Sequence, residues 1–321
     1  MAYIIAFILF ANLCFCFTAE ATNKDLAQWL EKLRREARSQ GVSAATLDLA
    51  LKDFSPSKRV LQLDRRQPEK TQTFNHYLTN VVPTARVSKG RSELERHYEL
   101  LEEIADRYRV QPRFIIALWA IESDFGRNMG QTPVIDALAT LAYDGRRSTY
   151  FRKELLIALH ILDEGHIPSN KMIGSWAGAM GQCQFMPWNF KRRAVDFDGD
   201  GRRDIWHTQA DVFASIANFL KSVGWHDDQT WGREIILPPE FDKKLIGLKT
   251  QKSLAQWQKL GVRRLNETAL PKRDLQASLV RPGRGSGRVF LIYDNYRTLL
   301  KWNNSNYFAL AVGALADRLK R

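Results

Sequence analysis

The sequence has 321 residues, of which 45% are hydrophobic and 26% charged, a composition typical of a folded protein. This length suits one large domain or two to three small ones, and we find no low-complexity tract or internal repeat, which argues against a disordered or a solenoid protein. The formal net charge of +13 favours a polyanionic partner, but nucleic acid, an acidic membrane surface and a carboxylate-rich cell wall satisfy it equally well.

The N-terminus has the pattern of an export signal. Residues 3–17, YIIAFILFANLCFCF, form an apolar run that is short for a membrane helix, and Ala19-Glu20-Ala21 provides the small residues of a cleavage site. No Lys or Arg precedes Lys24, so only the terminal amine supplies the usual positive charge, and an uncleaved anchor is the alternative. We predict a signal peptide over residues 1–21 and an exported protein.

The cysteines indicate neither a lipid anchor nor a disulfide. The residues before Cys14, Ala11-Asn12-Leu13, match a lipidation motif poorly. After removal of residues 1–21 the chain keeps one cysteine, Cys183, which we expect to be buried as a free thiol.

The first two-thirds of the chain read as helices. Asn23 is the expected cap of a helix that ends at Gly41, and Ser43 opens a second, short helix. Later apolar stripes predict helices over Arg91–Tyr108 (as one long helix), Val134–Tyr143, Tyr150–Leu162 and Gln209–Val223.

The pattern changes after Trp231. Residues 233–241, 275–282 and 287–296 are typical of strands, and RPGRGSGR (281–288) is expected to be a flexible turn. We therefore predict a small, partly β subdomain here, followed by a return to helix from Tyr293.

One helix carries a candidate catalytic group. Seven apolar residues lead into Glu122 in IIALWAIESDFG, on a helix expected to begin at Pro112 and to end at Gly126. Apolar surroundings and the negative end of the helix dipole both raise the pKa of such a carboxyl, which suits a general acid. A helix-end glutamate in water or paired with an arginine is an equally good reading. Asp124 points to nearly the opposite face, so no second carboxylate is available locally.

A glycine-rich stretch, GSWAGAMGQCQFMPWNF (174–190), has the composition of a sugar-binding surface. It combines flat apolar rings with neutral hydrogen-bonding groups, as a sugar requires, although a core loop with satisfied polar groups fits as well. The rings are Trp176, Phe185 and Trp188, and the polar groups are Ser175, Gln182, Gln184 and Asn189.

The next segment, DFDGDGRRDIW (196–206), resembles the first half of an EF-hand calcium loop. The twelfth position is His207, which offers no oxygen, so the loop is expected to close at the next acid. The predicted ligands of a structural Ca²⁺ are Asp196, Asp198, Asp200, the carbonyl of Arg202, and Asp211. A solvated acidic turn is the alternative.

Taken together, these motifs resemble the membrane-bound lytic murein transglycosylase B family of bacterial enzymes that cleave peptidoglycan. The matching segments run in family order from Tyr77 to Leu319. They are IESDFG, DALATLAYDGRR, GSWAGAMGQCQFMPWNF, AVDFDGDGRRDIW, ADVFASIANFL and YDNYRTLLKWNNSNYFALAVGALADRL. The resemblance implies a mainly α (α+β) fold with a lysozyme-like helical core, an EF-hand-like calcium loop and a small β-containing subdomain.

The resemblance also implies a domain order. After the signal peptide we expect an N-terminal helical segment, a catalytic core that holds the calcium loop, the β-containing subdomain and a C-terminal helical segment packed on the core. The respective ranges are 22–90, 91–231 (with the loop at 196–211), 232–292 and 293–321.

Site residues follow from the same motifs. Glu122 matches the catalytic acid and base. The implied substrate contacts are Ser175, Gln184, Arg146, Arg147 and Tyr77, together with Phe219, Trp302 and Phe308, which stand where the family has tyrosines. At these last three positions the ring remains but the hydroxyl is lost, which puts hydrogen bonding there in question.

The implied activity is cleavage of the MurNAc–GlcNAc bond with formation of a 1,6-anhydro ring, which requires one carboxylate and the substrate's own N-acetyl group. A hydrolytic muramidase and a non-catalytic, calcium-stabilised wall-binding scaffold are the alternatives. A nucleic-acid binder is the weakest, because the basic residues are dispersed. We expect a periplasmic monomer whose partner is the peptidoglycan glycan strand, with other cell-wall enzymes as candidate partners and no nucleic acid.

Overall fold

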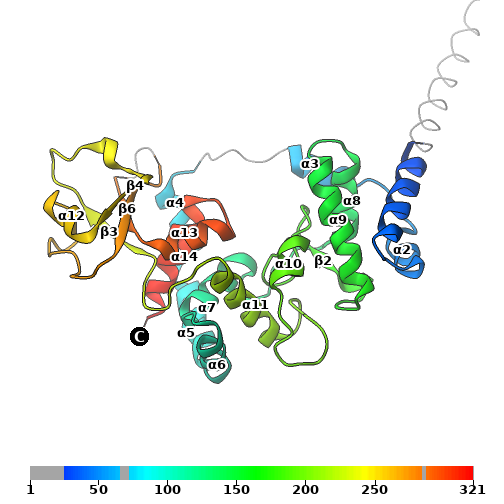
Figure 1. Cartoon of the computed structure of the whole chain (residues 1–321), viewed down its shortest axis with the longest axis horizontal. Coiled ribbons are helices and arrows are strands. Elements are labelled where there is room, and N and C mark those ends of the chain that lie inside the picture. Colours follow the sequence, from blue (N-terminus) through cyan, green and yellow to red (C-terminus); the bar gives the residue numbers. More distant parts are fainter. Residues whose placement is uncertain (1–24, 66–71, 284–286, 321) are drawn as a thin grey trace, which may run out of the picture. The chain divides into compact units, whose positions relative to one another are not determined.

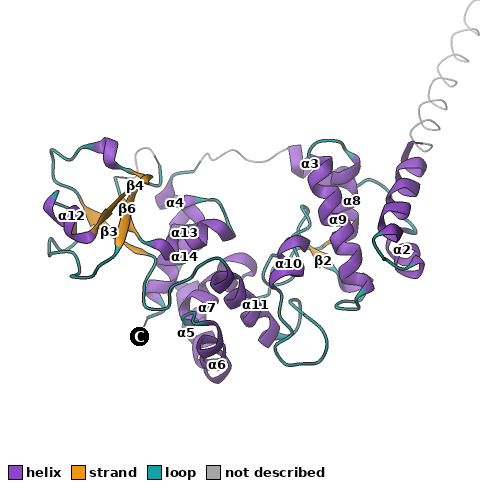
Figure 2. Cartoon of the chain, in the orientation of Figure 1, coloured by secondary structure: helices purple, strands orange, loops and turns teal. Residues whose placement is uncertain are grey.

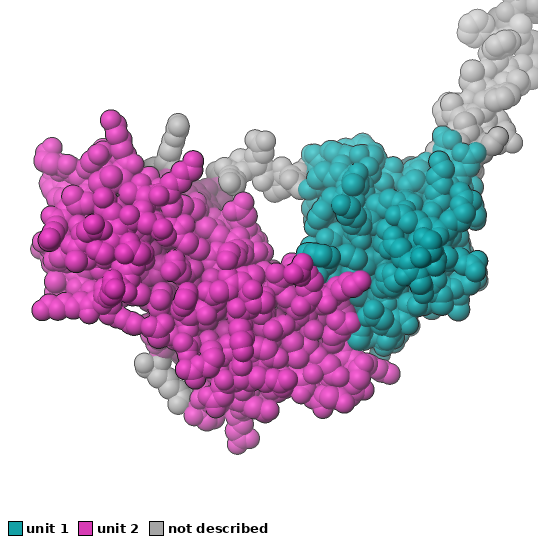
Figure 3. All heavy atoms as spheres, in the orientation of Figure 1, with its two compact units in different colours: residues 1–66, 130–179, 186–188 teal, residues 67–129, 180–185, 189–321 magenta. Residues whose placement is uncertain are grey.

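The computed structural model describes residues 25–65, 72–283 and 287–320, so the predicted signal peptide (residues 1–21) lies outside it. The chain divides into two compact units (Figure 3). Unit 1 combines the described part of Met1–Arg66 with Gly130–Ala179 and Met186–Trp188, and unit 2 combines that of Gln67–Met129 with Met180–Phe185 and Asn189–Arg321. Each unit is assembled from separate segments, whereas the domains expected from the sequence are continuous ranges. The expected domain boundaries therefore remain a prediction.

Unit 1 is built around a packed pair of helices, α8 and α9. Ser43 caps the short helix α2 as expected, since its hydroxyl accepts a hydrogen bond from the Thr46 N–H. The elements of unit 1 are a helix over residues 25–39, α2 (Ala44–Leu51), α3 (Lys58–Arg65), β1 (Thr132–Pro133), α8 (Val134–Tyr143), α9 (Ser148–Asp163), η1 (Ser169–Lys171) and β2 (Ile173–Gly174), which pairs antiparallel with β1 (Figure 2).

The helical part of unit 2 surrounds α7 (Pro112–Ser123). This helix packs against α5, α11 and α14, and every residue from Phe114 to Ala120 is buried (Figure 1). A helix that is apolar on all sides belongs in a core. The other helices of this part are α4 (Phe74–Val81), α5 (Thr84–Arg96), α6 (Tyr98–Tyr108), α11 (Gln209–Ser222), α13 (Asp294–Trp302) and α14 (Asn306–Arg318), while α10 (Pro187–Arg193) has its first two residues in unit 1.

Unit 2 also contains an antiparallel sheet of strand order β4-β6-β7-β3-β5. Trp257 of the adjoining helix α12 (Leu254–Lys259) is fully buried, and its indole N–H donates to the Ala277 carbonyl over 3.0 Å. The strands are β3 (Gly232–Ile236), β4 (Gly247–Ser253), β5 (Arg263–Arg264), β6 (Gln276–Val280) and β7 (Val289–Ile292), and η2 (Lys243–Leu245) precedes β4. The mainly α fold with a small β part is confirmed.

Two helix predictions were wrong in their bounds. The single helix expected over Arg91–Tyr108 is two helices, because the backbone at His97 leaves the helical region while its ring packs edge-on against Phe213 at 5.2 Å. The helix expected to end at Gly126 ends at Ser123, since Asp124 and Phe125 already have positive φ angles of 50° and 60°.

The C-terminal prediction of helix is confirmed, with a break between α13 and α14 at residues 303–305. The strands β4 and β5 were missed. Strand β4, GLKTQKS, lies at the edge of the sheet, mostly half-exposed, and lacks the apolar alternation that marks a strand. Within the described residues no helix has both the length and the apolar character needed to cross a membrane.

Candidate active site

Glu122 lies in the last turn of α7, as expected, and receives a hydrogen bond from a distant tryptophan. The Trp302 indole N–H donates to Glu122 Oε1 over 2.6 Å, although 180 positions separate the two residues in the chain. Trp302 occupies a position where the family resemblance implies a tyrosine. The tyrosine hydroxyl is absent, but the indole N–H of Trp302 donates a hydrogen bond to the carboxylate in its place.

The surroundings of Glu122 favour its protonated form. Burial raises the pKa of Glu122 to about 7, while the hydrogen bond from Trp302, which stabilises the carboxylate, lowers it. The side chain is nevertheless partly exposed, so a ligand can reach it. Among the described residues, no cation and no second carboxylate shifts the pKa of Glu122. The group is thus an acid near neutral pH and has no paired carboxylate.

Aromatic rings support Trp302 and enclose this carboxyl. The Trp302 ring lies 4.6 Å from Phe219 and 5.3 Å from Phe185, and the Arg193 guanidinium covers the Phe219 ring at 4.6 Å. These contacts hold the indole in the orientation that its hydrogen bond to Glu122 requires.

Tyr77 belongs to the same region. Burial and then the negative charge of Glu122 raise the pKa of Tyr77, so the phenol is within electrostatic reach of the carboxylate. Its ring packs against Tyr307 at 5.5 Å. Phe308, by contrast, is buried in the first turn of α14, where its N–H donates to the Ser305 hydroxyl. The structure therefore brings four of the predicted side chains together, namely Glu122, Tyr77, Phe219 and Trp302.

The two glutamines of GQCQ have different environments. Gln184 has a φ of 50°, and its amide N–H₂ donates to the carbonyls of Met129 and Gly181 at 3.0 and 2.9 Å, with its side chain half-buried. Gln182 is buried, accepts from the Trp119 indole N–H at 2.7 Å and donates to the Trp206 carbonyl at 2.8 Å. For Gln182 the reading as a satisfied core residue is correct, and it is not available to a sugar.

Gln182 connects three parts of the site. It joins α7, through Trp119, to the end of the aspartate loop, through Trp206. A Cβ atom at Gly126 would lie 2.5 Å from the Gln182 amide oxygen, and Gly126 has a φ of +78°, so only glycine fits there. The turn after Glu122 is thereby packed directly on Gln182.

Asp124 forms the end of the helix and is engaged by cations. It is the C-terminal cap of α7 and pairs with Arg86 at 3.3 Å and Arg127 at 2.7 Å.

Three predicted substrate contacts belong to unit 1. Arg146 and Arg147 both bind Asp64, at 2.8 and 2.5 Å, and Asp64 is almost fully buried. The Ser175 hydroxyl oxygen accepts from the backbone N–H groups of Ala177 and Ala179 at 3.3 and 3.0 Å. Asp64 was not identified from the sequence, because nothing local distinguishes it from other surface acids.

The aspartate loop is organised around Asp211. Oxygen atoms of Asp196, Asp198 and Asp211 lie within 4.8 Å of one another. Both Asp211 oxygens accept backbone N–H groups, from Phe197 and Asp204, at 2.7 Å each. Burial is the main cause that raises the pKa of Asp211 to about 6. A cluster of hard oxygen donors fits Ca²⁺.

The other predicted ligands lie on the same loop but outside this cluster. The Asp200 carboxylate accepts the Arg202 N–H at 2.8 Å, while the Asp196 oxygens accept from Gly199 and Gly201 at 2.8 and 2.9 Å. Aspartates in turns often bond the backbone a few residues on in this way, and both glycines have the positive φ that the turn requires.

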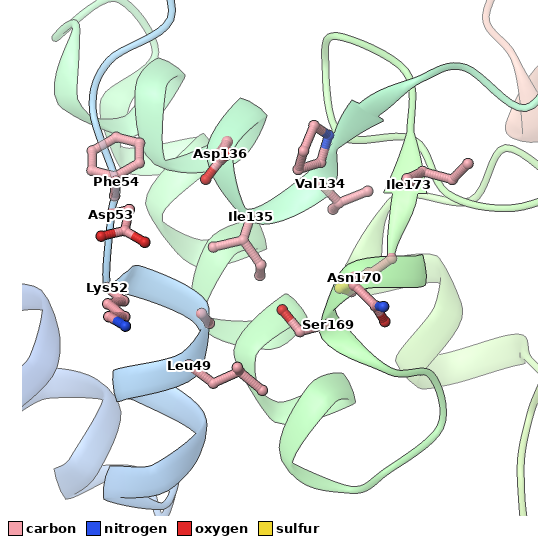
Figure 4. Close-up of a pocket in the computed structure, with 13 residues that line it drawn as sticks. Leu49, Lys52, Asp53, Phe54, Val134, Ile135, Asp136, Ser169, Asn170 and Ile173 are labelled. Carbon is pink, nitrogen blue, oxygen red and sulfur yellow. The ribbon is translucent and has the colours of Figure 1, made fainter.

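Unit 1 also contains an open pocket of about 370 Å³ (Figure 4). Asp53, Asp136 and Lys52 line it together with apolar side chains such as Ile135. None of the predicted site residues lines this pocket, so it is separate from the candidate active site.

Comparisons with known proteins identify the family of this chain. The family model of the transglycosylase SLT domain matches residues 25–317. Membrane-bound lytic murein transglycosylase B of Escherichia coli (strain K12) is 30% identical over 314 residues, which cover 92% of this chain and 83% of that protein.

Two solved structures are similar over nearly the whole chain. SltB3 from Pseudomonas aeruginosa, in complex with NAG-anhNAM-pentapeptide, has a TM-score of 0.89 at 45% identity, covering 91% of this chain and 78% of that one. The E. coli lytic transglycosylase Slt35 in complex with calcium has a TM-score of 0.76 at 29% identity, covering 92% of each. The chain therefore belongs to the SLT-domain transglycosylase family and is a peptidoglycan lytic transglycosylase.

Proposed function

We propose that Glu122 acts alone as both the acid and the base of the cleavage reaction. The observation that carries this proposal is its environment: a partly exposed carboxyl at the end of an apolar helix, held by one indole N–H, with its pKa raised to about 7. A paired-carboxylate mechanism needs a second acid within about 10 Å, and Asp124 is engaged by two arginines instead.

In this mechanism, protonated Glu122 donates its proton to the oxygen that links N-acetylmuramic acid to N-acetylglucosamine. As the bond between C1 and that oxygen breaks, the muramoyl N-acetyl oxygen bonds to C1. The 6-hydroxyl oxygen of the same sugar then attacks C1, the N-acetyl oxygen leaves, and the hydroxyl proton passes to Glu122. The enzyme regains its proton, and no water is consumed.

Trp302 positions Glu122 and stabilises the carboxylate that forms between the two steps. We assign substrate contacts to Tyr77 and Gln184 in unit 2, and separately to Ser175, Arg146 and Arg147 in unit 1. Phe219 and Phe308 are buried, so we assign them a supporting role in the packing of unit 2 and no direct contact with the sugar. The substrate is the peptidoglycan glycan strand. The SltB3 complex with an anhydro-sugar peptide supports this choice, and the apolar run at residues 3–17 supports export to the periplasm.

The test replaces Glu122 with Gln, which keeps the shape and removes the proton donor. We expect cleavage of purified peptidoglycan to fall by about 10³-fold while sedimentation with peptidoglycan is retained. Asp124→Asn is the matched control and should keep most of the activity. Unchanged cleavage by the Glu122 variant would remove this residue from the mechanism.

The mass of the products separates the transglycosylase from a hydrolase. An anhydro end is lighter by one water than a hydrolysed end, so mass spectrometry of products from the unmodified enzyme decides between them. Reducing ends as the main product would contradict the proposed ring closure.

We further propose that Ca²⁺ binds the loop through Asp196, Asp198 and Asp211, with Asp200 and the Arg202 carbonyl completing the site. The calcium complex of Slt35 supports this assignment. A chelator should lower the melting temperature by on the order of 5 °C, and Asp196→Asn should abolish that response. A melting temperature that a chelator does not change would contradict these ligands.

A further inference from the structure

Two exposed aromatic residues of unit 1 are tied to one buried carboxylate. Tyr150 and Trp188 are 46% and 47% exposed, whereas Glu154 is 5% exposed. Tyr150 stands one helical turn before Glu154 on α9, and the backbone N–H of Trp188 donates to Glu154 Oε2 over 2.8 Å. A single acid therefore lies beside both residues.

Tyr150 has its hydroxyl close to the buried acid. Burial, followed by the charge of Glu154, raises the pKa of Tyr150 to about 12, so the phenol lies within electrostatic reach of that carboxylate. The ring packs edge-on against Phe151 at 5.1 Å, and 46% of the residue is exposed. The ring is therefore supported by Phe151 while nearly half of the residue stays accessible.

Glu154 also fixes the backbone at Trp188. Trp188 is the second residue of α10, and its N–H is one of the donors that a helix start leaves without a partner inside the helix. The Glu154 carboxylate accepts it, so the indole is carried on an anchored helix start. The Tyr150 ring and the backbone that carries Trp188 are thus positioned before any ligand arrives, which reduces the entropy lost on binding.

We propose that Tyr150 and Trp188 form an aromatic platform that stacks on sugar rings of a glycan strand. This inference rests on the proposed function for the identity of the strand, and it adds a binding surface to the contacts assigned above. Sugars present apolar C–H faces that pack on aromatic rings. Directly before this segment, Arg146 and Arg147 have side chains that are 53% and 46% exposed, and such cations complement carboxylates of peptide-bearing muramic acid.

The test measures the affinity for peptide-free glycan strands in the Glu122→Gln background, where no turnover occurs. We expect Tyr150→Ala combined with Trp188→Ala to weaken binding of long strands by about tenfold, and to weaken binding of a single disaccharide less. Tyr150→Phe keeps the ring and should retain most of the affinity. In the active enzyme, the double variant should raise KM for long strands with little change in kcat.

Tyr98→Ala is the matched control, because Tyr98 is 56% exposed on α6 of unit 2 and has no part in the proposal. Affinity unchanged within twofold in a double variant with normal melting temperature would overturn the platform, as would an equal loss in Tyr98→Ala. If the double variant does not fold, the separate Trp188→Leu and Tyr150→Leu variants remove one ring each and provide the same comparison.

The outcomes also separate this proposal from the proposed function. Loss of cleavage in Glu122→Gln with unchanged strand affinity in the double variant would reject only the platform. A raised KM for long strands in the double variant of the active enzyme, together with full cleavage by Glu122→Gln, would reject only the assignment of Glu122.

Discussion

Asp64 of unit 1 and Glu122 of unit 2 show two ways in which this chain places a carboxylate among apolar residues. Asp64 is almost fully buried and binds the guanidinium groups of Arg146 and Arg147. Glu122 is less buried, but one indole N–H is its hydrogen-bond partner and no cation among the described residues lowers its pKa.

The difference separates a structural charge from a reactive one. Paired cations keep a buried carboxylate ionised, and their removal leaves an uncompensated charge. A carboxyl with one neutral donor instead holds its proton close to neutral pH and can exchange it with a substrate. Neutralising the acid should therefore lower the free energy of unfolding at Asp64 and raise it at Glu122.

The largest effect is expected at Asp64. Asp64→Asn weakens two charge-assisted hydrogen bonds at a nearly fully buried acid, to Arg146 and Arg147, and should lower the free energy of unfolding by about 3 kcal/mol, measured by denaturant titration of the full chain. Asp48→Asn is the control, because Asp48 pairs with Arg34 but its side chain is 73% exposed, and we expect less than about 1 kcal/mol. Equal effects of the two changes would show that the buried Asp64 contributes no more to stability than the exposed Asp48.

At Glu122 the same kind of change should stabilise the protein. The folded-state pKa of about 7 lies above the usual value of 4.5 for a glutamate, so the stability associated with the protonated form is present below pH 4.5 and is lost as the pH rises through 7. Glu122→Gln does not titrate. It should therefore match the unmodified protein at pH 4 and exceed its free energy of unfolding at pH 8 by up to about 3 kcal/mol.

Denaturant titrations at the two pH values measure this difference. A gap between Glu122→Gln and the unmodified protein that does not change with pH would mean that the pKa of Glu122 is not raised.

The smallest effect concerns the single hydrogen bond to Glu122. Trp302→Phe removes the indole donor that lowers the pKa, so the pKa of Glu122 should rise. The alkaline limb of the kcat/KM profile, where the acid loses its proton, should move upward by about one pH unit. Phe219→Leu weakens the packing that orients the indole but keeps the donor, so it should move the limb less than Trp302→Phe does. An alkaline limb at the same pH in Trp302→Phe and in the unmodified enzyme would contradict the role of the indole as the donor that lowers the pKa of Glu122.

Local patterns were read well from the sequence. Helix α8 has the predicted bounds, Val134–Tyr143, because its apolar stripe and its neighbours in the chain are enough to specify it. The aspartate loop folds around the predicted acids, since the turn depends on alternating aspartates and on glycines at Gly199 and Gly201. Glu122 at the end of an apolar helix is equally a local feature.

Contacts between distant segments could not be read in this way. The break at His97 follows from rings on other helices, and the strand β4 exists because β6 lies beside it. Gln182 looked like a sugar ligand by composition, but Trp119 and Trp206 occupy its amide. Asp64 and Glu154 became visible only with their partners.

The sequence by itself determined the family, the mainly helical fold, the acid at the end of α7 and the calcium-loop pattern, because each is written in residues close together in the chain. Only the tertiary structure decided which donor meets that acid. Helical periodicity and turn chemistry act over a few residues, whereas the bond from Trp302 to Glu122 spans 180 positions and forms only once α7 and α13 are packed in the same unit.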